Sequence, residues 1–139
     1  MTRSAALAAH DAGWHPVKIP KGKKFPPETG RTGYKGRNRV RGELLTEDWS
    51  DSSLGVRMPP DVIGIDLDVY NGGELGPLEA EYGPLPTTAM STARNDGSGI
   101  RFYRVPVGTM LTTAIPPGIE IVQYFHRYAV VAPSTNPKV

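Results

Sequence analysis

One stretch decides the fold expected for this chain: Val62-Ile63-Gly64-Ile65-Asp66-Leu67-Asp68-Val69. It is short, apolar and β-branched, which predicts a buried strand. Side chains alternate across a strand, so Asp66 and Asp68 share a face. Two carboxylates side by side are costly unless a cation holds them. Oxygen ligands at this spacing suit Mg²⁺ or Mn²⁺, ions that commonly act on phosphate. The alternative is that both aspartates simply face solvent before the following turn.

Short elements and many turns are predicted on both sides of this strand, since the chain has 14 prolines and 16 glycines. We expect helices at residues 2–12 and 75–82, and a helical turn at 43–49 with Thr46 as N-cap. Further strands are expected at 14–19, 54–58, 87–92, 100–105, 119–124 and 128–132. Antiparallel strands dominate the second half, which predicts an α+β fold rather than a doubly wound sheet.

Length and composition indicate one domain covering residues 1–139. The absence of cysteine excludes disulfides and thiolate metal sites. No stretch approaches the roughly 20 apolar residues of a membrane span, so we expect a soluble cytoplasmic protein without a membrane partner.

Charge is concentrated in one segment. Residues 18–41 contain nine basic residues and one acid, while the rest of the chain has seven basic and thirteen acidic residues. We interpret residues 21–41 as a long basic loop. Glycine, proline and Tyr34 between the charges favour contact with phosphates; the alternative is a solvated loop that keeps the protein soluble.

Other segments supply candidate partners for the aspartates. Glu120, in a β-branched strand, could complete a three-carboxylate group or simply point outward. The turn at Ser98-Gly99 leads into a strand in which Arg101 could bind phosphate. Arg127 could bind phosphate or brace a carboxylate, and its neighbour His126 could be a general base. Arg57, on the strand before the Asp strand, could reach the same site.

Taken in order, several pieces of the chain resemble one family. They are residues 5–7 and 13–17, Lys23-Lys24-Phe25-Pro26-Pro27, Gly55-Val56-Arg57, residues 62–68, Ile119-Glu120-Ile121, and Tyr128-Ala129-Val130-Val131-Ala132-Pro133-Ser134. This order is similar to the N-terminal domain of bifunctional DNA primase/polymerases. That family belongs to the archaeo-eukaryotic primase superfamily and is common in phage and plasmid replication proteins. The resemblance implies an RRM-like antiparallel catalytic palm with flanking short helices.

The same resemblance implies template-directed nucleotidyl transfer, in which a DNA primase/polymerase makes or extends primers on single-stranded DNA from nucleoside triphosphates. Two Mg²⁺ or Mn²⁺ ions would be held by Asp66, Asp68 and Glu120, the expected catalytic residues. Nucleotide binding is expected at Ser98, Gly99, Arg101 and Arg127. DNA or phosphate contact is expected at Lys23, Lys24, Arg37, Arg39 and Arg57. A replicative helicase, fused or separate, would be a partner, in a bacterial host cytoplasm if a phage encodes the chain.

Two departures from the family pattern leave alternatives open. Arg101 stands where the family usually has a histidine, and arginine cannot act as a neutral imidazole. The pattern also normally continues past the Ala-Pro-Ser strand, so we expect either a pared-down core or part of a longer replication protein. The alternatives are a weakened or inactive nucleic-acid-binding module and a metal-dependent nuclease or nucleotide hydrolase.

Overall fold

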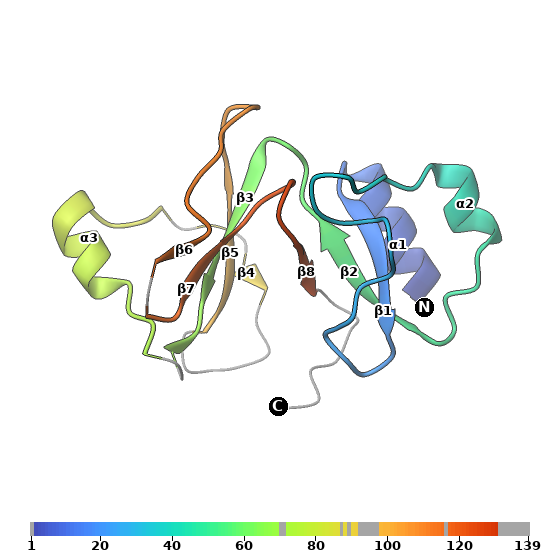
Figure 1. The fold of residues 1–139 in the computed structure, drawn as a ribbon, viewed down its shortest axis with the longest axis horizontal. Coiled ribbons are helices and arrows are strands. Elements are labelled where there is room, and N and C mark those ends of the chain that lie inside the picture. Colours follow the sequence, from blue (N-terminus) through green and yellow to red (C-terminus); the bar gives the residue numbers. More distant parts are fainter. Residues whose placement is uncertain are drawn as a thin grey trace.

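The computed structural model describes residues 2–69, 72–86, 88, 90–91, 98–115 and 117–130. Two antiparallel sheets lie side by side, with three short helices around them (Figure 1). The α+β class predicted from the sequence is confirmed. No helix among the described residues has the length and apolar character needed to cross a membrane.

The smaller sheet carries the N-terminal part of the chain. Its strand order is β1-β2-β8, with β1 at His15–Pro20, β2 at Ser52–Arg57 and β8 at Tyr128–Val130. Helix α1 (Thr2–Asp11) packs on β1 and β2, and α2 (Arg41–Thr46) packs on α1. Between β1 and α2, residues 21–40 have no helix or strand, and Arg41, the last residue of the predicted basic loop 21–41, begins α2.

The larger sheet carries the paired acids. Its order is β4-β5-β3-β7-β6, with β3 (Val62–Leu67) in the centre between β5 (Gly99–Arg104) and β7 (Ile119–Val122). The edge strands are β4 (Met90–Ser91) and β6 (Ala114–Ile115). Helix α3 (Gly76–Tyr82) lies at the far end from the smaller sheet (Figure 1).

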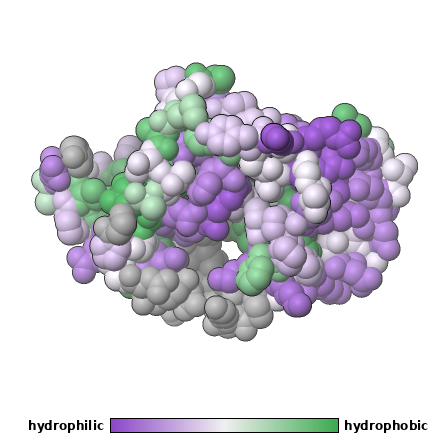
Figure 2. Space-filling model, in the orientation of Figure 1, coloured by the Kyte–Doolittle hydropathy of each residue, from purple (hydrophilic) through white to green (hydrophobic). Residues whose placement is uncertain are grey.

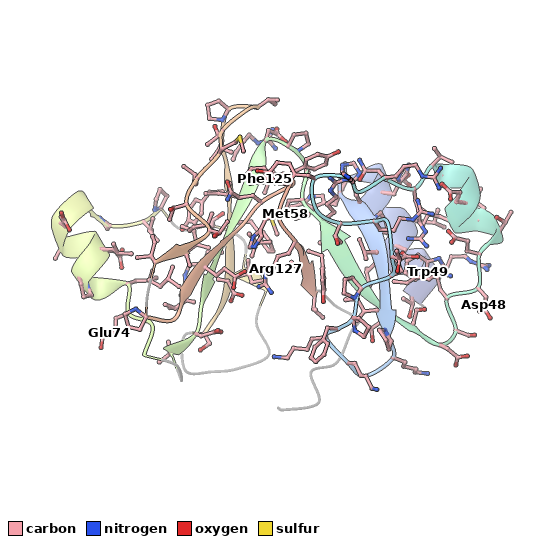
Figure 3. All side chains as sticks on the ribbon, viewed as in Figure 1. Asp48, Trp49, Met58, Glu74, Phe125 and Arg127 are labelled. Carbon is pink, nitrogen blue, oxygen red and sulfur yellow. The ribbon has the colours of Figure 1, made fainter. Side chains whose placement is uncertain are left out.

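The chain crosses twice between the sheets, after β2 and after β7. The first crossing carries Met58, which is fully buried and lies between the two sheets in Figure 3. Around it, one apolar cluster joins α1, α2 and both sheets through Ala6, Leu44, Trp49, Leu54, Val56, Ile100, Val122 and Ala129. The second crossing, residues 123–127, is short, so it holds its side chains close to the ends of both sheets.

Several predicted boundaries were wrong. Helix α2 ends at Thr46 rather than continuing to residue 49, and the Thr46 hydroxyl bonds back to the carbonyls of Gly42 and Glu43 instead of capping a new helix. Strand β6 was not predicted, since two residues are too short for an alternation pattern. Parts of the predicted strands at 87–92 and 128–132, and most of the loop 94–99, lie outside the described residues.

Candidate active site

Asp66 and Glu120 face each other across the centre of the larger sheet. The register of β3 and β7 pairs them directly. Directly opposed residues on antiparallel strands point to the same face, with their Cα atoms about 4.5–5.5 Å apart. Two acids from strands more than fifty residues apart therefore meet on one face, as the sequence hypothesis required.

A single arginine bridges the two acids. Arg127 donates a hydrogen bond of 2.6 Å from Nη2 to Oδ2 of Asp66, and its Nε lies 2.9 Å from Oε1 of Glu120. The crossing turn after β7 delivers Arg127 to this position, next to the larger sheet in Figure 3. Nε2 of His126 is 3.9 Å from the same Glu120 oxygen. Of the two roles considered for Arg127, the structure displays the bracing of carboxylates.

The electrostatics of the site disfavour a charged Asp66. Burial is the main cause that raises the pKa of the Asp66 carboxyl to about 6; Arg127 opposes the rise, and the charges of Asp68 and Glu120 act in the same direction as burial. Its side chain is only 17% exposed. An acid whose pKa stays high beside an arginine lies where further positive charge would stabilise its ionised form.

Asp68 lies just beyond β3, in a turn held by backbone contacts. Its amide donates to the carbonyl of Gly118, and its carbonyl accepts from Gly73. At Gly118, φ is +69°, and an added Cβ would lie 2.4 Å from the Gly73 nitrogen. Glycine is therefore required for this close approach, which fixes the end of β3 against the turn before β7.

Ser98 and Gly99 lie beside this turn. The Ser98 hydroxyl is buried and accepts a 2.9 Å hydrogen bond from the amide of Val69, and Gly99 pairs with Leu67. Both predicted nucleotide-site residues are thus next to the end of β3. The hydrogen bond from Val69 to Ser98 is structural, because it closes the strand end.

Arg101 does not share the face of the acids. The register of β3 and β5 pairs it with Ile65, whereas Asp66 is paired with Ile100. Since alternate residues point to opposite faces, Ile100 stands beside Asp66 and Arg101 points away. The expected role of Arg101 as a replacement for the family histidine at the acids therefore conflicts with the register.

Arg57 is a structural residue rather than a surface cation, contrary to expectation. It is 1% exposed and bonds the carbonyls of Gly33, Gly36 and Tyr124 and the side chain of Asn38. Its guanidinium also stacks 3.7 Å from the Tyr124 ring centroid. With these partners occupied in the interior, Arg57 is not available to DNA.

Arg39 is likewise buried, which corrects the expectation that it contacts DNA. It is 3% exposed and pairs with Glu28 and Glu47. Burial opposes the charge, but the hydrogen bonds that Arg39 donates to the two glutamates outweigh burial and raise the pKa of Arg39. Of the remaining predicted contacts, Lys23 and Arg37 are exposed and Lys24 is half-buried, so these three stay candidates.

The donor chemistry of the site suits a hard divalent ion, but a three-acid cluster is not assembled. Among the described residues no group of three or more His, Asp or Glu side chains is arranged to hold a metal. Asp66 and Glu120 offer carboxylate oxygens on one face, and the raised pKa of Asp66 shows that added positive charge would be favourable. The guanidinium of Arg127 contacts both of these acids.

Comparison with protein families identifies the family of this chain. The model of the bifunctional DNA primase/polymerase N-terminal family matches residues 5–139. The chain belongs to this family. Membership implies a nucleotidyltransferase-type activity in DNA replication. Comparison with curated proteins and with solved structures gives no match.

Two polar residues beside the crossing turn, the buried Gln123 and the half-buried Asn38, were not predicted from the sequence. Gln123 is 2% exposed, and its amide both accepts from and donates to the backbone of Leu111. Asn38 connects Arg57 to the hydroxyl of Tyr124. Gln123 falls in the predicted strand 119–124 and Asn38 in the predicted basic loop, and an amide side chain at either place gives no sequence signal of its partners.

Proposed function

We propose that this chain catalyses template-directed nucleotidyl transfer, making or extending primers on single-stranded DNA during phage or plasmid replication. The observation that carries the proposal is the direct pairing of Asp66 with Glu120 on the central strands of a primase/polymerase-family sheet. Both residues lie on paired strands rather than on loops, which suits a site that aligns two reacting groups.

In this proposal Asp66 and Glu120 hold Mg²⁺ or Mn²⁺, with Asp68 at the end of β3 as a third acid. When bound, the metal supplies charge stabilisation for the primer hydroxyl and for the triphosphate. Arg127 neutralises the acids in its absence. With the acids bound to metal, the Arg127 guanidinium would be available to donate bidentate hydrogen bonds to phosphate oxygens, the contact that arginine makes best.

The partners of such a reaction are a single-stranded template and nucleoside triphosphates, with a replicative helicase fused or separate. Lys23, Lys24 and Arg37 remain the candidates for backbone contact. They lie on the basic loop without any of the buried glutamate pairs that occupy Arg39.

A second function, a binding module without turnover, is favoured by one observation. The acids are already bridged by Arg127, and the β5 residue beside Asp66 is Ile100, which can neither donate nor accept a proton. A module of this kind would bind DNA with its basic loop while the acids serve only to position the crossing turn.

The experiment that separates these functions is an assay of priming and primer extension with full product analysis. The protein is incubated with a single-stranded template, nucleoside triphosphates and Mg²⁺ or Mn²⁺, with and without a primer. Elongated products that disappear in Asp66→Asn support transfer. Template shortening or release of free nucleotides indicates a hydrolase, and DNA binding without any product indicates the binding module.

A further inference from the structure

Tyr34 and Phe125 form an aromatic pair in which Tyr34 is exposed and Phe125 is half-buried. Tyr34, from the basic loop, stacks on Phe125, from the crossing turn, with ring centroids 5.2 Å apart and an interplanar angle of 27°. Tyr34 is 74% exposed, although nothing in a solvated loop requires an aromatic ring there. The crossing turn therefore contributes to two sites. Phe125 belongs to the aromatic pair, while Arg127, two residues later, contacts the acids (Figure 3).

The pair borders an apolar hollow of about 220 Å³. Tyr34 and Phe125 form one wall, and Val62, Val105 and Met110 line the others. The neighbouring loop leaves Val107 73% and Met110 63% exposed, and Figure 2 shows apolar residues on the projecting loop above β3. The hollow is below the roughly 300–1,000 Å³ of pockets that enclose drug-sized ligands, and fits a single ring-sized group.

Buried polar side chains hold this surface in place. Arg57 fixes the loop of Tyr34 through the carbonyls of Gly33 and Gly36, and fixes the start of the crossing turn through Tyr124. Gln123 fixes the opposite loop through both backbone groups of Leu111. An exposed ring on a braced loop loses little conformational entropy when a ligand stacks on it.

The charges around the pair are those expected beside a nucleic-acid strand. Lys35 and Arg37 follow Tyr34 along the loop and are exposed. Asp61, beside the hollow-lining Pro60 and Val62, is paired with Arg104. A planar aromatic surface with exposed cations at its side stacks nucleobases and attracts the phosphates between them.

We propose that Tyr34 and Phe125 form a stacking platform for an unpaired base of single-stranded DNA, outside the acid site. This deepens the proposed function by naming where its template strand is gripped. Base stacking is sequence-tolerant, because every base has a π-face, so the platform predicts binding without sequence preference.

The test is fluorescence anisotropy of the full chain with a labelled oligothymidylate and with an abasic strand of the same length. Tyr34→Ala is expected to weaken oligothymidylate binding by roughly 5- to 100-fold, and Tyr34→Phe to restore it. On the abasic strand wild type and Tyr34→Ala should bind alike. Phe125→Ala is the second variant, and Leu45→Ala, an exposed residue on α2, is the matched control with no expected effect.

Equal binding of oligothymidylate by wild type and Tyr34→Ala would overturn the platform, as would wild-type protein that binds neither strand. A shift from dimer to monomer in Tyr34→Ala, measured by sedimentation with DNA affinity unchanged, would assign the surface to self-association instead. Primer extension is measured on the same samples. If wild type binds the oligothymidylate in a Tyr34-dependent way but extends no primer, the catalytic proposal is rejected and the stacking platform is retained.

Discussion

Arg127 and Asp66 form the shortest ion pair described at the acid face, with 2.6 Å between Nη2 and Oδ2. The same guanidinium contacts Glu120, so one cation neutralises two acids from different strands. A divalent ion that bound between these acids would have to displace it. The negative charge of the two acids is therefore balanced by a side chain of the protein itself.

Replacing Arg127 with Gln should raise the affinity for Mn²⁺, by roughly 5- to 30-fold for a coupling of about 1–2 kcal/mol. The variant lacks the ion pairs that compete with Mn²⁺ for the two acids, and it lacks the positive charge that repels Mn²⁺. The metal-free protein should meanwhile become less stable, because Asp66 and Glu120 are left facing each other. Isothermal titration with Mn²⁺ and urea unfolding measure the two effects. Arg41→Gln, which removes an exposed pair with Asp11, is the control. Weaker Mn²⁺ binding by Arg127→Gln would show that Arg127 does not compete with the metal.

Asp66 should make the stability of the metal-free protein depend on pH. Its pKa rises from 3.8 when unfolded to about 6 when folded, mainly through burial. The folded state therefore binds the proton more tightly, and wild type loses stability as pH rises from about 4 to about 6. Asp66→Asn should match wild type near pH 4 and exceed it by roughly 1–3 kcal/mol at pH 7. Urea unfolding at a series of pH values tests this; a difference that does not vary with pH would contradict it.

Arg57→Lys should destabilise the protein strongly, by roughly 3 kcal/mol or more. An ammonium group cannot reach the acceptors on Gly33, Gly36 and Tyr124 at once, so buried carbonyls lose their donors. Arg104→Lys, at an arginine whose side chain is 83% exposed, should change the free energy of unfolding very little. Equal urea midpoints for the two variants would mean that the loop 21–41 does not depend on Arg57.

The salt dependence of DNA binding should separate exposed from buried members of the basic loop. Lys23→Gln and Arg37→Gln should each make the slope of log K against log salt shallower by about 0.7 for every phosphate contact removed. Arg39→Gln should instead lower stability, because Glu28 and Glu47 lose their partner. Unchanged slopes in both exposed variants would exclude Lys23 and Arg37 from the interface.

The strand that carries the acids could be predicted from the sequence, because apolar alternation identifies a strand and its period places Asp66 on a face. The register of this strand with its neighbours could not be predicted, and a shift of one residue would move every side chain of a strand to the opposite face of the sheet. That is why the sequence predicts Arg101 at the nucleotide site, although the register places Ile100 beside Asp66. Buried arginines were also beyond prediction. In the sequence, Arg57 and Arg39 do not differ from exposed arginines. Only the folded chain places carbonyls around Arg57 and glutamates around Arg39.

Primer extension by wild type, Asp66→Asn, Glu120→Gln and Asp11→Asn, with Mn²⁺ on one primed single-stranded template, tests the central claim most directly. We predict that wild type and Asp11→Asn elongate the primer. Both acid-site variants should lose elongation by at least the 10²-fold expected when a group that stabilises transition-state charge is removed, while still binding the template. Elongation by Asp66→Asn or Glu120→Gln at the wild-type rate would contradict the assignment of this face as the active site.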